Sequence, residues 1–144
     1  FALQSLLALI VALPIIYYQQ ALNAWYNYLG FALWIFGFSF EVIADWQLKN
    51  FLCKKTGKAC NIGLWKYSRH PNYFGEVVLW WGFYLLTLTP ATPWFVVLGP
   101  IMINVLILKV SGVPMLEKRM QNNPKYREYL KTTRRFFPWF QKKP

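Results

Sequence analysis

The side chains richest in chemistry lie between positions 63 and 76, in the sequence GLWKYSRHPNYFGE. They are two cations, an imidazole, an amide, two tyrosines and a carboxylate: Lys66, Arg69, His70, Asn72, Tyr67, Tyr73 and Glu76. Pro71 favours extended backbone just before it and suits the first turn of a helix. Cations beside a helix N-terminus form an anion site, because the unpaired N–H groups and the helix dipole favour phosphate or carboxylate. The residues alone do not distinguish a nucleotide from a phospholipid headgroup.

Two further carboxylates precede this segment and stand four residues apart. Glu41 and Asp45 fall on one face of a helix, with Lys49 one turn further on. Spacing alone favours a structural ladder in which Lys49 neutralises Asp45. Glu76 has a structural alternative too, an ion pair with Arg69. Because an ionisable side chain in an apolar span is costly, each of these carboxylates is also a functional candidate.

Isolated polar residues give weaker signals. Lys109 closes an apolar stretch, and its ammonium group either binds an anion or extends to the headgroups. Gln4 lies within an apolar stretch, where an interhelical hydrogen bond is the commoner role. Cys53, Cys60 and His70 make an incomplete zinc set, since no fourth ligand has a recognisable spacing. We therefore predict no metal site.

Four apolar stretches must position these side chains: residues 1–18, 26–46, 73–88 and 94–110. A helix needs about 17 to 25 residues to cross roughly 30 Å of hydrocarbon, so each stretch is interpreted as a membrane span. Of the 144 residues 56% are apolar, which excludes a disordered, collagen-like or disulfide-knotted chain. We predict an all-α membrane protein, a bundle of about four transmembrane helices, forming a single domain over residues 1–144.

The sixteen Lys and Arg residues, the source of the net charge of +11, all lie from residue 49 onward. With four spans they share one side of the membrane, which the positive-inside rule makes cytoplasmic. We therefore expect a cytoplasmic loop at residues 49–72 and a cytoplasmic tail at residues 111–144. The protein is expected to be multi-pass, in a bacterial inner membrane or the endoplasmic reticulum.

The tail contains a predicted surface helix. Asn123 can cap it and Pro124 suits its first position. Basic and aromatic residues then alternate from 134 to 143. This pattern fits an interfacial anchor on anionic lipid and a part in ligand binding equally well.

The segment at 63–76 resembles the signature of the steroid 5-alpha-reductase C-terminal family, particularly its bacterial-type branch of multi-pass membrane proteins. The resemblance covers nearly the whole chain. Its blocks are Ala44-Asp45-Trp46-Gln47, Gly63-Leu64-Trp65, Tyr67-Ser68-Arg69-His70-Pro71-Asn72-Tyr73-Phe74-Gly75-Glu76, Ser111-Gly112-Val113-Pro114, Leu116-Glu117-Lys118-Arg119, Asn123-Pro124, and Tyr126-Arg127 with Tyr129. The longest block is specific, whereas a bare Arg-His-Pro also occurs in isoprenylcysteine and phospholipid methyltransferases.

The resemblance implies a membrane-embedded, NADPH-dependent reductase of a carbon–carbon double bond conjugated to a carbonyl, in a steroid-like or other lipid substrate. Asn72 and Glu76 match family residues at the nicotinamide end of the cofactor, and Asp45 matches an acid that contacts the nucleotide. The other cofactor-binding candidates that it implies are Arg69, His70, Tyr73, Lys54 and Lys109. The sequence shows no Gly-x-Gly-x-x-Gly after a strand, so a Rossmann domain is not the binder.

The resemblance leaves the catalytic acid unassigned. Family reductases use a tyrosine and a carboxylate from earlier spans to protonate the substrate carbonyl. The chain opens on Phe1 with no basic residue ahead of its apolar run, so we interpret it as the C-terminal part of a larger bundle. We therefore expect the proton donor upstream. Gln4 lies where a substrate-facing polar residue could sit on the first span.

Two other functions stay open. An S-adenosylmethionine-dependent lipid or isoprenylcysteine methyltransferase shares the helical bundle and the Arg-His-Pro turn, but needs a nucleophile rather than a carbonyl acid. A non-catalytic scaffold would hold anionic lipid on its basic face, and its binding would depend diffusely on the cations. Asn72 and Glu76 together with Asp45 favour the reductase. NADPH is cytosolic and polyanionic, so its site should face the basic side.

Overall fold

The computed structural model describes residues 1–18, 24–53 and 59–141. This part of the chain is built of helices and connecting segments and contains no strand, which confirms the predicted all-α class. The elements are α1 (Ala2–Val11), α2 (Leu13–Ile16), α3 (Trp25–Leu52), η1 (Gly63–Lys66), α4 (Pro71–Thr87), η2 (Trp94–Val97), α5 (Leu98–Val105), η3 (Leu106–Val110), α6 (Val113–Met120) and α7 (Pro124–Thr132).

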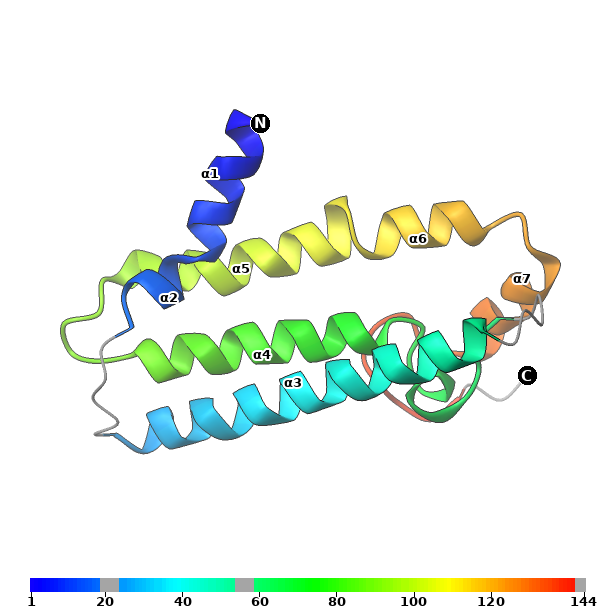
Figure 1. Cartoon of the computed structure of the whole chain (residues 1–144), viewed down its shortest axis with the longest axis horizontal. Coiled ribbons are helices and arrows are strands. Elements are labelled where there is room, and N and C mark those ends of the chain that lie inside the picture. The colour runs from blue at the N-terminus through cyan, green and yellow to red at the C-terminus, as the bar shows by residue number, and fades with distance from the viewer. Residues whose placement is uncertain (19–23, 54–58, 142–144) are drawn as a thin grey trace.

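Helices α3 and α4 run antiparallel side by side, and α4 lies between α3 and the path of α5 and α6 (Figure 1). Four glycines line their contact: Gly30, Gly37, Gly75 and Gly82. A β-carbon added to Gly37 would lie 2.4 Å from the Leu79 backbone nitrogen, and one added to Gly82 would lie 2.5 Å from that of Trp34. Because no side chain fits between them, the two backbones approach as closely as small-residue contacts allow in membrane helix pairs.

The last apolar stretch forms one helical path from η2 through α5 and η3 to the end of α6 (Figure 1). The turns of η3 widen to π-helical hydrogen bonding, and the Ser111 and Gly112 backbone nitrogens both donate to the Leu106 carbonyl. Helix restarts at Val113, with Pro114 in the first turn, where a missing N–H costs nothing. The helical path therefore passes residue 110, where the fourth predicted span ends, and continues to Met120.

Two helical segments are long and apolar enough to cross a membrane, Trp25–Leu52 and Trp94–Met120. Helix α4 has 17 residues, and α1 has 10. The first predicted span, residues 1–18, divides at Ala12, because Pro14 begins the separate short helix α2, and α1 turns away from the bundle (Figure 1). The count of four spans stays a prediction.

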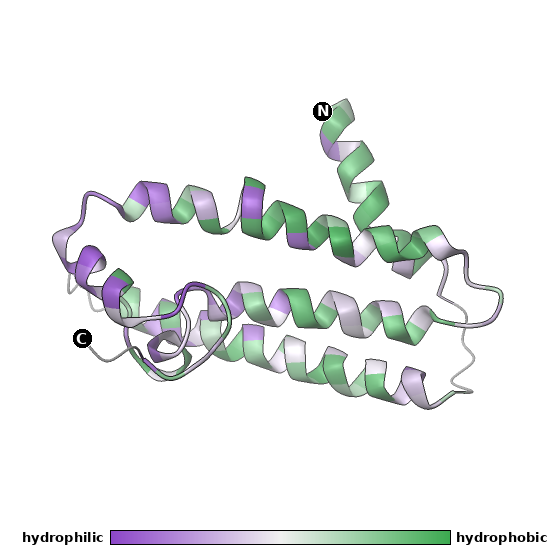
Figure 2. Cartoon of the chain, turned by 180° about the vertical axis from the view of Figure 1, so that it is seen from behind, coloured by the Kyte–Doolittle hydropathy of each residue, from purple (hydrophilic) through white to green (hydrophobic). Residues whose placement is uncertain are grey.

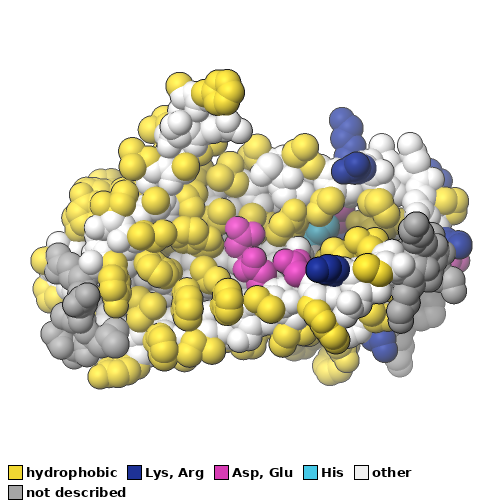
Figure 3. All heavy atoms as spheres, in the orientation of Figure 1, with side chains coloured by type: hydrophobic (Ala, Val, Ile, Leu, Met, Phe, Trp, Pro, Cys, Tyr) yellow, Lys and Arg dark blue, Asp and Glu magenta, His cyan; other side chains and the backbone are white. Residues whose placement is uncertain are grey.

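The two ends of the bundle differ in charge. Apolar residues run along the helices, and the polar residues concentrate toward the end that carries α7 (Figure 2). The Lys and Arg side chains visible in Figure 3 lie in that same half of the molecule. Asn123 caps α7, since its side-chain oxygen accepts a hydrogen bond from the Lys125 backbone nitrogen at 3.0 Å. The cytoplasmic side of this end and the surface location of α7 stay predictions.

Candidate functional site

Three carboxylates and one amide meet where the basic half of α3 faces the start of α4. We call Glu41, Asp45, Glu76 and Asn72 the carboxylate cluster. The Asn72 side-chain nitrogen donates to an Asp45 carboxylate oxygen at 3.0 Å. A β-carbon on Gly75 would lie 2.7 Å from the Glu41 backbone nitrogen, so the two helices touch directly beside the cluster. Acidic side chains accordingly gather in the middle of the face seen in Figure 3.

The structural alternatives drawn from sequence spacing do not form. Among the described residues, Asp45 makes no ion pair with Lys49, and its carboxylate bonds Asn72 instead. Glu76 does not pair with Arg69, which contacts Glu117. Within the same residues Glu76 has no cation within ion-pair distance. The structure thus brings together Asp45, Asn72 and Glu76, which the resemblance assigned to the cofactor, and Glu41, a functional candidate from the sequence that the resemblance gave no role.

Two other polar residues of the 63–76 segment, Arg69 and His70, contact Glu117 on α6 together with Arg135, and we call these four residues the Glu117 cluster. An Arg69 guanidinium nitrogen lies 2.9 Å from one Glu117 oxygen, and Nε of Arg135 lies 3.2 Å from the other. Nε2 of His70 lies 3.4 Å from the first oxygen. In the sequence Glu117 belongs to one of the blocks that resemble the family, but no role was predicted for it. Its contacts with Arg69, His70 and Arg135 were therefore missed.

His70 is nearly inaccessible, with 2% of its surface exposed, and its ring stacks on that of Tyr73 with centroids 5.8 Å apart. Burial lowers the pKa of His70 to about 4, against the opposing effect of Glu117. The imidazole is therefore neutral at pH 7, and its contact with Glu117 is a hydrogen bond rather than an ion pair. His70, at the N-cap of α4, and Tyr73, in its first turn, thus pack against each other where the helix begins.

The lowered pKa of His70 predicts a pH dependence of stability. Between pH 6.5 and about 4 the unfolded chain binds the proton that folded His70 excludes, so stability falls as pH falls through this range. The slope from this one group approaches 1.4 kcal/mol per pH unit. Thermal unfolding of wild type and His70→Gln from pH 7 to pH 4.5 measures it. The variant should lose less stability over this range; parallel profiles would contradict the assignment.

A buried hydroxyl holds the loop that carries these residues. Burial raises the pKa of Tyr129, so its hydroxyl stays protonated and contacts the carbonyls of Trp65 at 2.5 Å and Ser68 at 3.2 Å. The Trp65 indole nitrogen in turn donates to the Ala44 carbonyl at 2.9 Å. These bonds tie α7 to η1 and η1 to α3.

Removing that hydroxyl should destabilise the loop. Tyr129→Phe leaves two buried carbonyls short of a donor, and we expect a loss of about 1–3 kcal/mol. Tyr126 is a matched control, because it is buried in the same helix and its hydroxyl makes no hydrogen bond within the described residues. Thermal unfolding in detergent compares the two variants. Equal losses in Tyr129→Phe and Tyr126→Phe would contradict the role.

The remaining predicted residues lie apart from the carboxylate cluster. Lys109 is exposed within η3, and Lys54 lies outside the described residues. Gln4 lines a groove of about 410 Å³ between α1 and η3, whose other walls include Leu7 and Leu106. Across residues 1–18, 24–53 and 59–141, no three His, Cys, Asp or Glu side chains are placed to hold a metal ion.

An all-helical membrane protein with a polar cluster at the basic end of its central helix pair is the class that these features define. The chain belongs to the DUF1295 family, described as a protein of unknown function, whose profile matches residues 1–133. This family is steroid 5-alpha-reductase-like, so the resemblance seen in the sequence is confirmed.

One curated relative is 3-oxo-5-alpha-steroid 4-dehydrogenase 1 of Mus musculus. It is 42% identical over 60 residues, which make up 39% of this chain and 23% of the mouse protein. The match thus spans less than a quarter of that relative's length. No solved structure matches the chain.

Proposed function

We propose that this chain forms part of a membrane-embedded, NADPH-dependent reductase. Its substrate would be a steroid-like or other lipid with a carbon–carbon double bond conjugated to a carbonyl. The family and the name of the mouse relative support the reaction class. The observation that carries the proposal is the contact of Asn72 with Asp45 beside Glu76, since ionisable side chains within apolar helices are costly to bury and for that reason mark functional sites.

The carboxylate cluster suits the nicotinamide riboside half of the cofactor. The Asn72 side-chain oxygen is buried and accepts no hydrogen bond from the described residues, so it can accept from a ligand amide. The carboxylates of Asp45 and Glu76 can accept from ribose hydroxyls. NADPH would supply the hydride. The protein's own contribution is to hold these acceptors in register, which the close α3–α4 contact at Gly75 does.

The phosphates need a different set of residues, because three carboxylates repel an anion. Arg69 has a buried Nε–H that finds no partner in the part of the chain that the structure describes, although Glu117 offsets part of the Arg69 charge. Lys109 and Lys54 are the other proposed phosphate ligands. His70, neutral and buried, and Tyr73, stacked on it, position the first turn of α4. We assign the substrate-facing role to Gln4 and its groove.

Nucleotide binding by the full-length protein in detergent tests the proposal. NADPH should bind and raise the thermal unfolding temperature, whereas S-adenosylmethionine should do neither. Binding of S-adenosylmethionine without NADPH would transfer the assignment to a lipid methyltransferase. Binding of neither nucleotide, with stabilisation by anionic lipid alone, would favour the scaffold and overturn the reductase.

A further inference from the structure

The C-terminal residues 134–141, which we call the tail strap, are tied to the loop before α4. The Arg69 backbone nitrogen donates to the Arg134 carbonyl at 2.9 Å, and the Trp139 backbone nitrogen donates to the Tyr67 carbonyl at 3.1 Å. The Ser68 hydroxyl donates to the Phe136 carbonyl at 2.6 Å. In Figure 1 the red C-terminal segment passes behind the ends of α3 and α4, whereas the acidic side chains show on the face of Figure 3.

The length of α3 indicates where the tail strap lies along the bundle axis relative to the bilayer. About 20 residues separate Trp25 from Ala44, which at 1.5 Å per residue is roughly 30 Å, the thickness of bilayer hydrocarbon. At that level the Trp65 indole bonds the Ala44 carbonyl, and the Leu64 nitrogen bonds the Gln47 side chain. The strap is bonded to the segment that follows η1. If Trp25 marks one boundary of the hydrocarbon, we expect the strap at the other, between acyl chains and headgroups.

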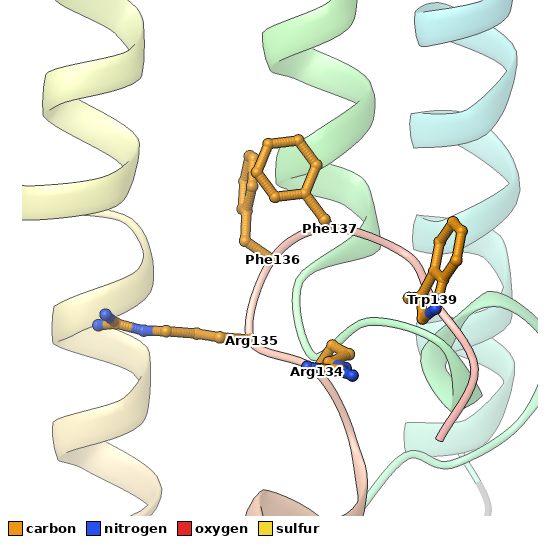
Figure 4. Close-up of a pocket in the computed structure, with 5 residues that line it drawn as sticks. All are labelled: Arg134, Arg135, Phe136, Phe137 and Trp139. Atoms are coloured by element: carbon orange, nitrogen blue, oxygen red, sulfur yellow. The ribbon is translucent and has the colours of Figure 1, made fainter. Parts of the chain in front are cut away.

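The side chains of the tail strap suit that boundary. Phe137 and Trp139 are 72% and 64% exposed, although the backbone beside them is held by hydrogen bonds. They line an open cavity of about 490 Å³ with Phe136, Arg134 and Arg135 (Figure 4). Arg135 reaches toward α6 and pairs with Glu117, while the Arg134 side chain has no ion pair among the described residues. The lining of the cavity is almost wholly apolar, and Arg134 and Arg135 stand at its border.

We propose that the tail strap is a binding site for the headgroup of an anionic phospholipid. The guanidinium of Arg134 and the unused N–H groups of Arg135 would bind the phosphate, for which the planar fork is suited. Phe137 and Trp139 would lie against the upper acyl chains, as aromatic rings do at membrane interfaces. The described Lys and Arg side chains in this half of the molecule complement an anionic leaflet. The site is separate from the proposed reductase activity.

A lipid titration of the full-length protein in neutral detergent tests the site. Phosphatidylglycerol is added, and both the unfolding temperature and the number of lipids retained in native mass spectrometry are measured. The variant is Arg134→Gln with Trp139→Ser, which leaves the Arg135–Glu117 pair intact. The matched control is Lys118→Gln with Met115→Ser on α6, because it also removes one exposed cation and one exposed apolar side chain.

We expect the phosphatidylglycerol concentration for half-maximal stabilisation to rise about tenfold or more in the strap variant and less than threefold in the control. Neither phosphatidylcholine nor glycerol phosphate, which has no acyl chains, should stabilise the wild-type protein or either variant. Equal shifts in the two variants would show diffuse attraction and overturn the site. Stabilisation by glycerol phosphate would identify a free-phosphate site instead. If NADPH no longer stabilised the strap variant while phosphatidylglycerol stabilised it as it does the wild type, the strap would belong to the nucleotide site instead.

Discussion

Replacing Asn72 by alanine should lower NADPH-dependent reduction by the full-length protein about 100-fold. One amide group supplies both the bond to Asp45 and the free, buried oxygen assigned to the cofactor. Losing a single oriented hydrogen-bonding group at a reacting centre typically costs a factor of 10²–10³ in rate. The measurement is the initial rate of NADPH oxidation with an enone lipid, together with the affinity for NADPH.

The control for this variant is Asn61→Ala. Asn61 is an exposed amide in the loop before η1, and its side-chain oxygen accepts a hydrogen bond from the Gln141 side-chain nitrogen at 3.2 Å. The Asn61→Ala variant should retain wild-type turnover. Glu76→Gln keeps the shape of the cluster and removes one charge, so it should reduce turnover without unfolding the protein. Full activity of both Asn72→Ala and Glu76→Gln would remove the carboxylate cluster from the site.

The identity of the cluster residues could be predicted from the sequence, but their contact could not. Apolar runs and the helix start at Pro71 locate Asn72 and Glu76 on a helix, and Asp45 on another. Whether the two helices meet at those residues depends on their register. That register follows from glycines seven residues apart on each helix, Gly30 with Gly37 and Gly75 with Gly82. The glycine spacing is visible in the sequence, but the apolar stretches that locate the helices carry no information on which glycines face one another.

The partner of Arg69 shows why spacing failed at the start of α4. An ion pair between Arg69 and Glu76 assumes that both residues belong to one helix. His70, however, has φ −139°, which is outside the helical range, so the chain before Pro71 leaves the axis of α4. The Arg69 side chain then reaches Glu117, a residue far along the sequence on α6. Local periodicity carries no information on such a contact.

Gly37→Ala should destabilise the folded protein by about 3 kcal/mol, against the trend of helix propensity. In an isolated helix the change from glycine to alanine stabilises by about 1 kcal/mol. Here the new β-carbon would lie 2.4 Å from the Leu79 nitrogen and 2.6 Å from the Gly75 carbonyl oxygen, so the backbones of α3 and α4 must separate. Overpacking of this kind typically costs 1–3 kcal/mol, and rigid backbone atoms place this position at the upper end.

The control is Ser39→Ala, on an exposed position of the same helix, where the change should be neutral or slightly stabilising. Unfolding by denaturant in mixed micelles gives both free energies. Adding Gly82→Ala to Gly37→Ala should cost less than the sum of the single changes, because helices already separated at one contact accommodate the second. A stable Gly37→Ala protein would mean that α3 and α4 do not touch at Gly75. The register that brings Asn72 to Asp45 would then be wrong as well.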